Sequence, residues 1–280
     1  MRTPEEMFEL ILRVAREDDR IRAVSMSGSR ANRDCPADVY QDYDITYYVT
    51  EVAPFRDNDA WIAEHFGEPA LMQKPESMGL IPPDNNGDFP YLMIFPDGNR
   101  IDLCFTARTR AVPGEPEVAL MDRDGILADA VADETHWYVK RPTEKHFSDC
   151  CNEFHWCLNN VAKGIARDEI SYTMDMLECN VRGMLLVMLG WYAGMKHDFR
   201  VSVGKHGKYL RKFLPEELYL RFRDSYGGAD TASMWKSAFD VLDIFGEVAR
   251  EVAAGLGFRY NEAEEDAIRD YMEKVRRGLK

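Results

Sequence analysis

Apolar residues recur along this chain with two different spacings. The first segment is predicted to be a helix with Thr3 as N-cap, Pro4 in the first turn and Glu6 completing a capping box, because apolar residues follow it at helical spacing. Short strand-like runs then cover residues 21–26, 42–49, 91–95 and 100–105, with a helix around residues 59–66 among them. Pro96-Asp97-Gly98-Asn99 is a turn signal that predicts a hairpin of the last two runs.

From about Thr143 onward the spacing becomes that of helices. The predicted helices cover residues 144–166, 177–195, 215–223, 231–256 and 262–277. A boundary near Arg141-Pro142 is predicted, since proline cannot continue a strand ladder and suits the first turn of a helix. The pattern therefore predicts an α+β chain, with a small mixed sheet in residues 1–141 and an all-α bundle in residues 142–280.

The net charge of the chain indicates which classes of ligand it is expected to bind. Its 35 basic and 49 acidic residues give a net charge of −14, which disfavours nucleic acid and favours a cationic ligand, although solubility alone explains the total equally well. The six cysteines form no CxxC pair, the N-terminus lacks a signal-peptide pattern, and no apolar run is long enough to cross a membrane. We expect a cytoplasmic protein, monomeric or weakly dimeric.

Two carboxylates in the second strand-like run suggest a metal site. Asp42 and Asp44 are two residues apart, so both should project from one face of the strand. Their mutual repulsion would be relieved by a cation, and oxygen ligands favour Mg²⁺. Acidic pairs on a solvated strand face are also common, so this motif alone decides little.

Two further motifs strengthen the metal hypothesis. Asp102 interrupts an otherwise apolar strand, and if that strand neighbours the first acidic one, three carboxylates converge, enough to hold two Mg²⁺ for an in-line phosphoryl displacement. The Gly28-Ser29 turn follows the first strand, where backbone N–H groups and a hydroxyl can approach a phosphate. A solvated strand face and an ordinary turn are the alternatives.

Gly28-Ser29, Asp42-Tyr43-Asp44-Ile45 and a later strand Asp102 together resemble the signature of the DNA polymerase β type nucleotidyltransferase superfamily. The strings GSRAN, QDYDI, RIDL, CNEFHW, VAKGIAR and GKHGKYL resemble the bacterial aminoglycoside 6-adenylyltransferases, which modify streptomycin. The resemblance runs from the first helix to about Leu214. It implies a nucleotidyltransferase domain followed by a helical domain, and AMP transfer from ATP to the 6-hydroxyl of streptomycin with release of pyrophosphate.

The resemblance also implies roles for single residues. Asp42 and Asp44 would be metal ligands, and Asp102 would be the general base or a further ligand. Gly28, Ser29 and Arg30 would contact the triphosphate. Lys205 and Lys208, in GKHGK, would neutralise the β- and γ-phosphates, with a solvated loop as the alternative.

The helical half offers contacts for a cationic acceptor. Glu153 and Asp175 are candidates to bind the guanidinium groups of streptomycin, with Trp156 as a stacking surface. The same region contains histidines and cysteines at spacings that also suit zinc, although cysteines pack equally well in cores. These are His146, Cys150, Cys151, His155 and Cys157.

Some features leave the acceptor open. Where the resembled family has a tryptophan after CNEF, this chain has His155, and residues 33–36 and 84–88 are further places where specificity would differ. A lincosamide, another metabolite or a protein hydroxyl are alternative acceptors. A degenerate nucleotide-binding regulatory module is the alternative outside enzymes. The joint presence of the candidate site residues argues against it; these are Gly28, Ser29, Asp42, Asp44 and Asp102.

Overall fold

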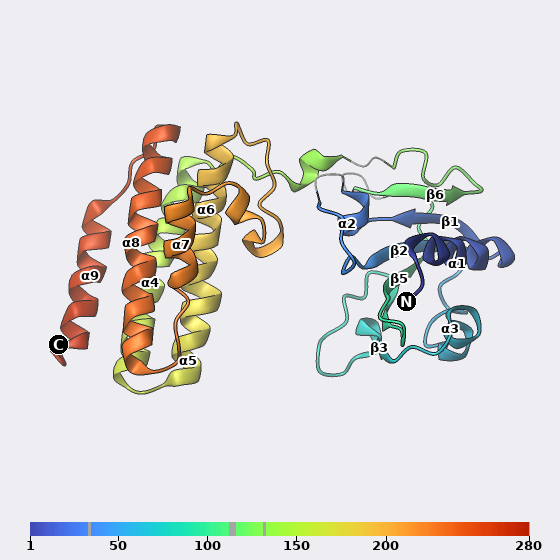
Figure 1. Cartoon of the computed structure of the whole chain (residues 1–280), viewed down its shortest axis with the longest axis horizontal. Helices are drawn as coiled ribbons and strands as arrows, with labels where there is room; N and C mark the ends of the chain where they lie inside the picture. The colour runs from blue at the N-terminus through green and yellow to red at the C-terminus, as the bar shows by residue number, and fades with distance from the viewer. Residues whose placement is uncertain (33–34, 112–115, 131–132, 280) are drawn as a thin grey trace. The chain divides into compact units, whose positions relative to one another are not determined.

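The computed structural model describes the chain except for residues 33–34, 112–115, 131–132 and 280. It divides into two compact units, Met1–His136 and Trp137–Lys280. Figure 1 shows that the first unit contains the sheet and the second consists of helices. Among the described residues, no helix is both long and apolar enough to cross a membrane.

The first unit is built on one six-stranded sheet in the order β3-β4-β5-β2-β1-β6. Its strands are β1 (Ile21–Met26), β2 (Tyr43–Val49), β3 (Leu71–Gln73), β4 (Phe89–Ile94), β5 (Arg100–Thr106) and β6 (Val118–Asp122). Its helices are α1 (Pro4–Glu17), α2 (Gly28–Ala31) and α3 (Asp59–Phe66), with 3₁₀ turns at Pro75–Ser77 and Glu134–Trp137. β2 and β5 run parallel, whereas the other pairs are antiparallel, so the predicted mixed sheet is confirmed.

One face of this sheet packs against α1 and α3 to form the core of the unit. Alternate residues of β2 point into it, and Tyr43, Ile45 and Tyr47 are buried there. The Tyr47 hydroxyl donates to the Ile11 carbonyl of α1, and Phe8 makes an edge contact with Tyr43 at 5.5 Å. The opposite face of β2 is thereby left for polar side chains.

The second unit is the predicted helical bundle. Its helices are α4 (Glu144–Ala166), α5 (Ile170–Asp175), α6 (Arg182–Lys196), α7 (Glu216–Asp224), α8 (Thr231–Leu256) and α9 (Glu262–Arg276), with a π-helix at Met176–Val181 and 3₁₀ turns at Lys205–Gly207 and Leu210–Lys212. α4 packs against α6, α8 and α9 (Figure 1). The rings of Phe154 in α4 and Phe245 in α8 stack 3.7 Å apart at the centre of this core.

The structure differs from the sequence expectations in several places. The turn after β1 is the one-turn helix α2, and the short helix α5 and the edge strands β3 and β6 were not predicted. The apolar stripe expected as one helix over residues 177–195 begins as a π-helix before α6. Its first turns contain Glu178 and Arg182, and the buried Arg182 guanidinium binds that carboxylate at 2.7 Å and the Ser225 hydroxyl at 2.8 Å. The spacing of apolar residues along the sequence cannot indicate a buried polar contact of this kind.

Candidate functional site

Three carboxylates lie on the sheet face that is turned away from α1 and α3. In the parallel ladder of β2 and β5, Asp44 lies directly opposite Asp102. Asp42 is two residues before Asp44 and so belongs to the same face, although β2 begins only at Tyr43. The side chains of Asp42 and Asp102 are 34% and 20% exposed, so both still reach solvent.

Arg100 holds two of these carboxylates together. Its Nε and Nη2 donate to the two oxygens of Asp102 at 2.8 and 2.7 Å, a bidentate arrangement that favours strong pairing. Its Nη1 lies 3.3 Å from Oδ2 of Asp42. One guanidinium therefore bridges Asp42 and Asp102, and no ion pair with Asp44 is found among the described residues.

The repulsion among the three carboxylates affects Asp44 most strongly. Burial, followed by the charges of Asp102 and Asp42, raises the pKa of Asp44 to about 6. Burial also raises the pKa of Asp42, although the nearby Arg100 opposes that shift. The sheet face is thus short of positive charge at Asp44.

Gly28 allows the backbone to approach Asp44 closely. Its φ is +68°, and a Cβ placed there would lie 1.9 Å from Oδ2 of Asp44. The Ser27 N–H donates to the Asp44 carbonyl at 3.0 Å, which fixes the start of α2 against β2. A glycine is therefore required at this junction for steric reasons, whatever ligand binds there.

Arg30 has a structural role in the same junction. Its guanidinium donates to the carbonyls of Asp42 and Gln41 at 3.0 and 2.9 Å and lies 4.0 Å over the Tyr43 ring. These contacts hold the carbonyls just before β2, which begins at Tyr43. Ser29, in the same helical turn, accepts from the Gln41 side-chain amide through its carbonyl at 3.2 Å.

The donor set of this face suits a hard divalent cation. It offers carboxylate oxygens without thiols or imidazoles, as Mg²⁺ prefers, and Asp44 has a raised pKa that a cation would reverse. Within the described ranges, no three acidic, histidine or cysteine side chains form a ready-made metal site. Since Arg100 already bridges Asp42 and Asp102, its guanidinium has to move if both carboxylates are to bind a cation.

The two lysines expected to bind phosphates lie in the helical unit. Lys205 and Lys208 are both exposed, and Lys208 Nζ lies 5.1 Å from the centre of the Tyr209 ring. The turn between them places His206 at a φ of +55°. A cavity of about 390 Å³ beside it is lined partly by Gly204, His206 and Gly207.

The residues expected to hold the acceptor do not form one cluster. Glu153 and Trp156 are exposed on α4, and Glu153 accepts from the Cys157 thiol at 3.2 Å. Asp175 is exposed at the end of α5 and raises the pKa of the neighbouring Cys179. Trp156 lines a groove with His155 and other residues, and neither Glu153 nor Asp175 is among its lining residues.

The cysteines of α4 belong to the core. Cys150, Cys151 and Cys157 are buried, and burial raises the pKa of each thiol. His155 is buried beside Tyr260, whereas His146 is exposed. Packing in the core explains the positions of the three cysteines.

The two loops expected to differ in specificity are described in part. Arg33 and Asp34 lie outside the described residues. In the acidic insert, the backbone N–H groups of Asp84 and Asn85 donate to the Glu76 carboxylate at 3.0 and 3.1 Å. Asp88 pairs with Arg108 at 2.7 Å.

Comparison with known proteins identifies the family. The family model described as Streptomycin adenylyltransferase matches residues 1–275. The chain belongs to this family. The predicted resemblance is thereby confirmed.

Named relatives of this streptomycin adenylyltransferase family member cover nearly the whole chain. It is 37% identical to the "Aminoglycoside 6-adenylyltransferase" of Bacillus subtilis (strain 168), over 98% of each chain. It is 36% identical to the protein of the same name from Campylobacter jejuni, over 93% of this chain and 91% of that one. A crystal structure of an aminoglycoside 6-adenyltransferase from Bacillus subtilis aligns with 98% of this chain and 99% of its own, at a TM-score of 0.49 and 33% identity.

One residue of the site in this adenylyltransferase family member was not anticipated. The charge inside an apolar strand indicated Asp102 in RIDL but not Arg100, although the two are spaced so that they share a strand face. An arginine two residues from an acid in a strand is the signal that could have revealed the pair.

Proposed function

We propose that this chain transfers AMP from ATP to a hydroxyl of an aminoglycoside, with the 6-hydroxyl of streptomycin as the acceptor and pyrophosphate as the leaving group. The observation that carries the proposal is the pairing of Asp44 with Asp102 across β2 and β5, with Asp42 on the same face. Family membership and the names of the relatives support the reaction and the class of acceptor.

The three carboxylates would hold Mg²⁺. Bound in two positions, Mg²⁺ would supply positive charge near the attacking and leaving oxygens of an in-line displacement. Asp42 and Asp44 are proposed as ligands. Asp102 is proposed either as a further ligand or as the base that accepts the proton of the attacking hydroxyl.

Other residues of the chain would bind and orient the substrates. Gly28 and Ser29 would bring backbone N–H groups and a hydroxyl to the triphosphate, next to Asp44. Arg30 would act mainly by fixing the start of β2, because its guanidinium already binds two carbonyls there. Lys205 and Lys208 would neutralise the β- and γ-phosphates, since both are exposed and charged.

The acceptor would be held by acidic and aromatic side chains of the helical unit. Glu153 and Asp175 would pair with its cationic groups, and Trp156 offers a ring that is 67% exposed. Because these residues do not share one groove, each is proposed to contact a different part of the acceptor.

The test is a product assay. Purified protein is incubated with ATP, Mg²⁺ and a panel containing streptomycin, kanamycin and a lincosamide, and the products are identified by mass spectrometry. We expect an adenylylated streptomycin, and no product from Asp44→Asn. The matched control is Asp19→Asn, whose carboxylate is 96% exposed in the same unit and should retain activity.

The possible outcomes separate the alternatives. Adenylylation of the lincosamide alone would keep the reaction and change the acceptor. ATP binding without any product, also with protein substrates, would support a regulatory module and overturn the proposal.

A further inference from the structure

A groove on the helical unit lies between α4 and α9 and encloses about 380 Å³. This volume falls within the range of small-molecule sites. Two exposed aromatic rings line it, Trp156 at 67% exposure and Tyr271 at 37%. His155, Glu264, Asn152 and Asn159 supply polar atoms. All of these residues belong to α4 and α9, so the groove is complete within this unit.

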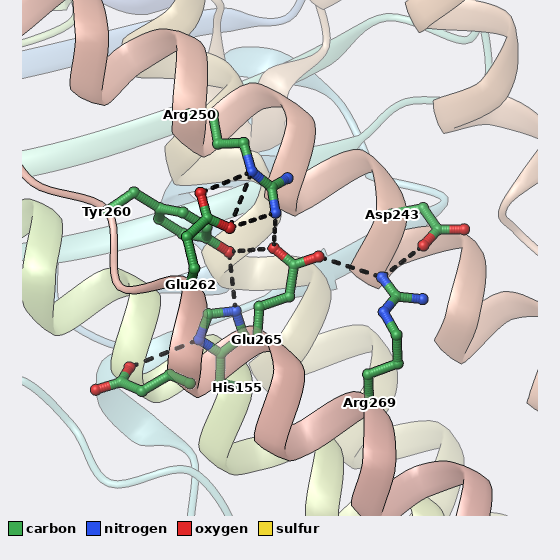
Figure 2. Close-up of polar contacts among 8 residues, drawn as sticks. His155, Asp243, Arg250, Tyr260, Glu262, Glu265 and Arg269 are labelled. Carbon is green, nitrogen blue, oxygen red and sulfur yellow. Dashed lines mark hydrogen bonds and ion pairs between the residues drawn. The ribbon is translucent and has the colours of Figure 1, made fainter.

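The buried polar network behind the groove fixes the proton of His155 (Figure 2). Both oxygens of Glu265 serve as acceptors, because Oε2 accepts from Arg250 at 2.6 Å and Oε1 from Arg269 at 3.2 Å. The Tyr260 hydroxyl gives its one proton to Glu265 at 2.8 Å. Its oxygen must then accept from His155 Nε2, which lies 3.3 Å away. We therefore assign the hydrogen of the imidazole to Nε2.

His155 Nδ1 is consequently a free lone pair. The side chain is buried, and burial lowers the pKa of His155, with the Glu264 charge opposing, so the ring is neutral. In the part of the chain that the structure describes, Nδ1 has no hydrogen-bond partner. Oε2 of Glu264 lies 3.7 Å from it. Two acceptors thus face each other with no donor between them.

A buried acceptor without a donor is costly, and a ligand that supplies one relieves that cost. The donor has to be cationic because one of the two acceptors is a carboxylate. The exposed faces of Trp156 and Tyr271 also favour a cation, and a planar one most of all. Neutral hydrogen-bond donors satisfy only part of this surface.

We propose that the groove between α4 and α9 binds a small organic cation bearing a guanidinium group, which donates to His155 Nδ1 and pairs with Glu264 between the rings of Trp156 and Tyr271. This site is formed without the sheet carboxylates. The inference rests on the proposed function for the role of Trp156 in holding the acceptor, and deepens it by naming His155 and Glu264 as the groove residues that take a guanidinium group.

The experiment uses n-butylguanidinium as probe and n-butylurea as its uncharged counterpart of the same shape. Binding to the full chain is measured by calorimetry in EDTA without ATP, so that transfer plays no part. We expect butylguanidinium to bind about tenfold or more tightly than butylurea. Glu264→Gln and His155→Phe should each weaken butylguanidinium by about tenfold or more, since each removes one acceptor.

Two controls keep the test decisive. Glu273→Gln removes a carboxylate of α9 that pairs with Arg277 instead of lining the groove, and binding should be unchanged. Asp44→Asn should also leave binding unchanged, which excludes the sheet carboxylates as the site. Because His155→Phe alters a buried residue, Trp156→Ala on the exposed surface provides a second variant, and it should weaken binding too.

The proposal is overturned if butylurea binds as tightly as butylguanidinium, if Glu264→Gln leaves the affinity unchanged, or if neither probe binds. Loss of binding in Asp44→Asn would relocate the cation to the sheet face and equally overturn it. The probes have no hydroxyl group and the solutions contain no ATP, so these results test binding in the groove, whereas the product assay tests adenylyl transfer.

Discussion

At the scale of single residues, the sheet face combines three carboxylates with one guanidinium. Arg100 neutralises the pair that it contacts, Asp42 and Asp102. Asp44 lies opposite Asp102 without such a contact, and its raised pKa reflects this. The face is therefore stabilised by protonation or by a bound cation, and each of these states can be tested by substitution.

Asp44→Asn should stabilise the metal-free protein near neutral pH. A carboxyl whose pKa is raised from 3.8 to about 6 contributes stability that is present at low pH and lost as pH rises through 6. The shift corresponds to about 3 kcal/mol at most. Urea unfolding in EDTA at pH 4.5 and 7.5 should show a gain for the variant mainly at pH 7.5. An equal gain at both values would contradict the assignment.

Arg100→Gln should lower metal-free stability and increase the stabilisation by Mg²⁺. An ion pair this exposed contributes about 0.2–1 kcal/mol to the free energy of unfolding. Because the Arg100–Asp102 pair is bidentate, the loss should lie near the upper end of that range. Without the guanidinium, Mg²⁺ no longer competes for Asp42 and Asp102, and the rise in melting temperature on adding Mg²⁺ should exceed that of the wild type. Arg22→Gln, which breaks a pair with Asp124 elsewhere, is the control. The same Mg²⁺ response in both variants would refute this competition.

Gly28→Ala should cost both stability and activity. The positive φ costs about 1–2 kcal/mol for a residue with a Cβ, and that Cβ would displace the Asp44 carboxylate. Gly257→Ala is the matched control, because Gly257 also has a positive φ, of +76°, but nothing within 4 Å of the added Cβ. Transfer activity should fall at least about a hundredfold in Gly28→Ala alone. Similar activities in the two variants would show that Asp44 tolerates the contact.

At the scale of elements, α9 is attached to the bundle by buried charge as well as by apolar packing. Glu265 is 6% exposed and receives hydrogen bonds from Arg250 of α8 and Arg269 of α9 (Figure 2). Tyr260, in the connection between the two helices, adds a third. This network both positions α9 and orients His155 toward the groove.

Glu265→Gln should destabilise the helical unit by about 2–4 kcal/mol, because it leaves two guanidinium groups without their shared carboxylate. Glu262→Gln breaks only a pair with Arg250 that is largely exposed, and should cost less than about 1 kcal/mol. Urea unfolding gives the two values, and hydrogen exchange should show faster opening of α9 in Glu265→Gln. Equal losses in both variants would mean that the buried network adds nothing.

The elements that the sequence predicted well are those with long, regular apolar spacing. α4, α8 and β1 occupy the expected residues, because a helix or strand with one buried face shows its period directly. The strands β3 and β6 were not predicted, since each has at most five residues and lies at an edge of the sheet where burial is partial. Local spacing also cannot reveal the π-helix before α6.

Only those parts of the candidate site that follow from residue type and strand alternation could be predicted from the sequence. Alternation placed Asp42 and Asp44 on one face, and the ladder of β2 with β5 brings Asp102 opposite Asp44. The Arg100 bridge depends on side-chain conformation, and the His155 groove depends on how α9 packs against α4. Neither is encoded in local spacing.

At the scale of the whole molecule, the net charge of −14 acts on any cationic ligand before contact. Such attraction is screened over about 8 Å at physiological ionic strength. It raises association rates for every cation and therefore cannot by itself distinguish one aminoglycoside from another. Discrimination has to come from short-range contacts.

Streptomycin should accordingly bind more weakly as salt rises, yet remain tighter than kanamycin at every salt concentration. Calorimetry with a non-hydrolysable ATP analogue and Mg²⁺ at two salt concentrations measures both effects. Replacing an acidic residue that pairs with the acceptor away from water should reduce the binding free energy of the acceptor by roughly 2–5 kcal/mol. Equal affinity for the two drugs would leave only the general charge effect.

The parallel pairing of β2 with β5 also has a consequence for the time course of folding. The two strands are separated in sequence by α3, β3 and β4, so their ladder closes a long loop and should form after the β4–β5 hairpin. Closing it brings Asp44 against Asp102, which makes like-charge repulsion part of the barrier to folding. Because burial and the neighbouring carboxylates raise the pKa of Asp44 only as the ladder forms, proton uptake accompanies its closure, and the chain should refold faster at pH 4.5 than at pH 7.5.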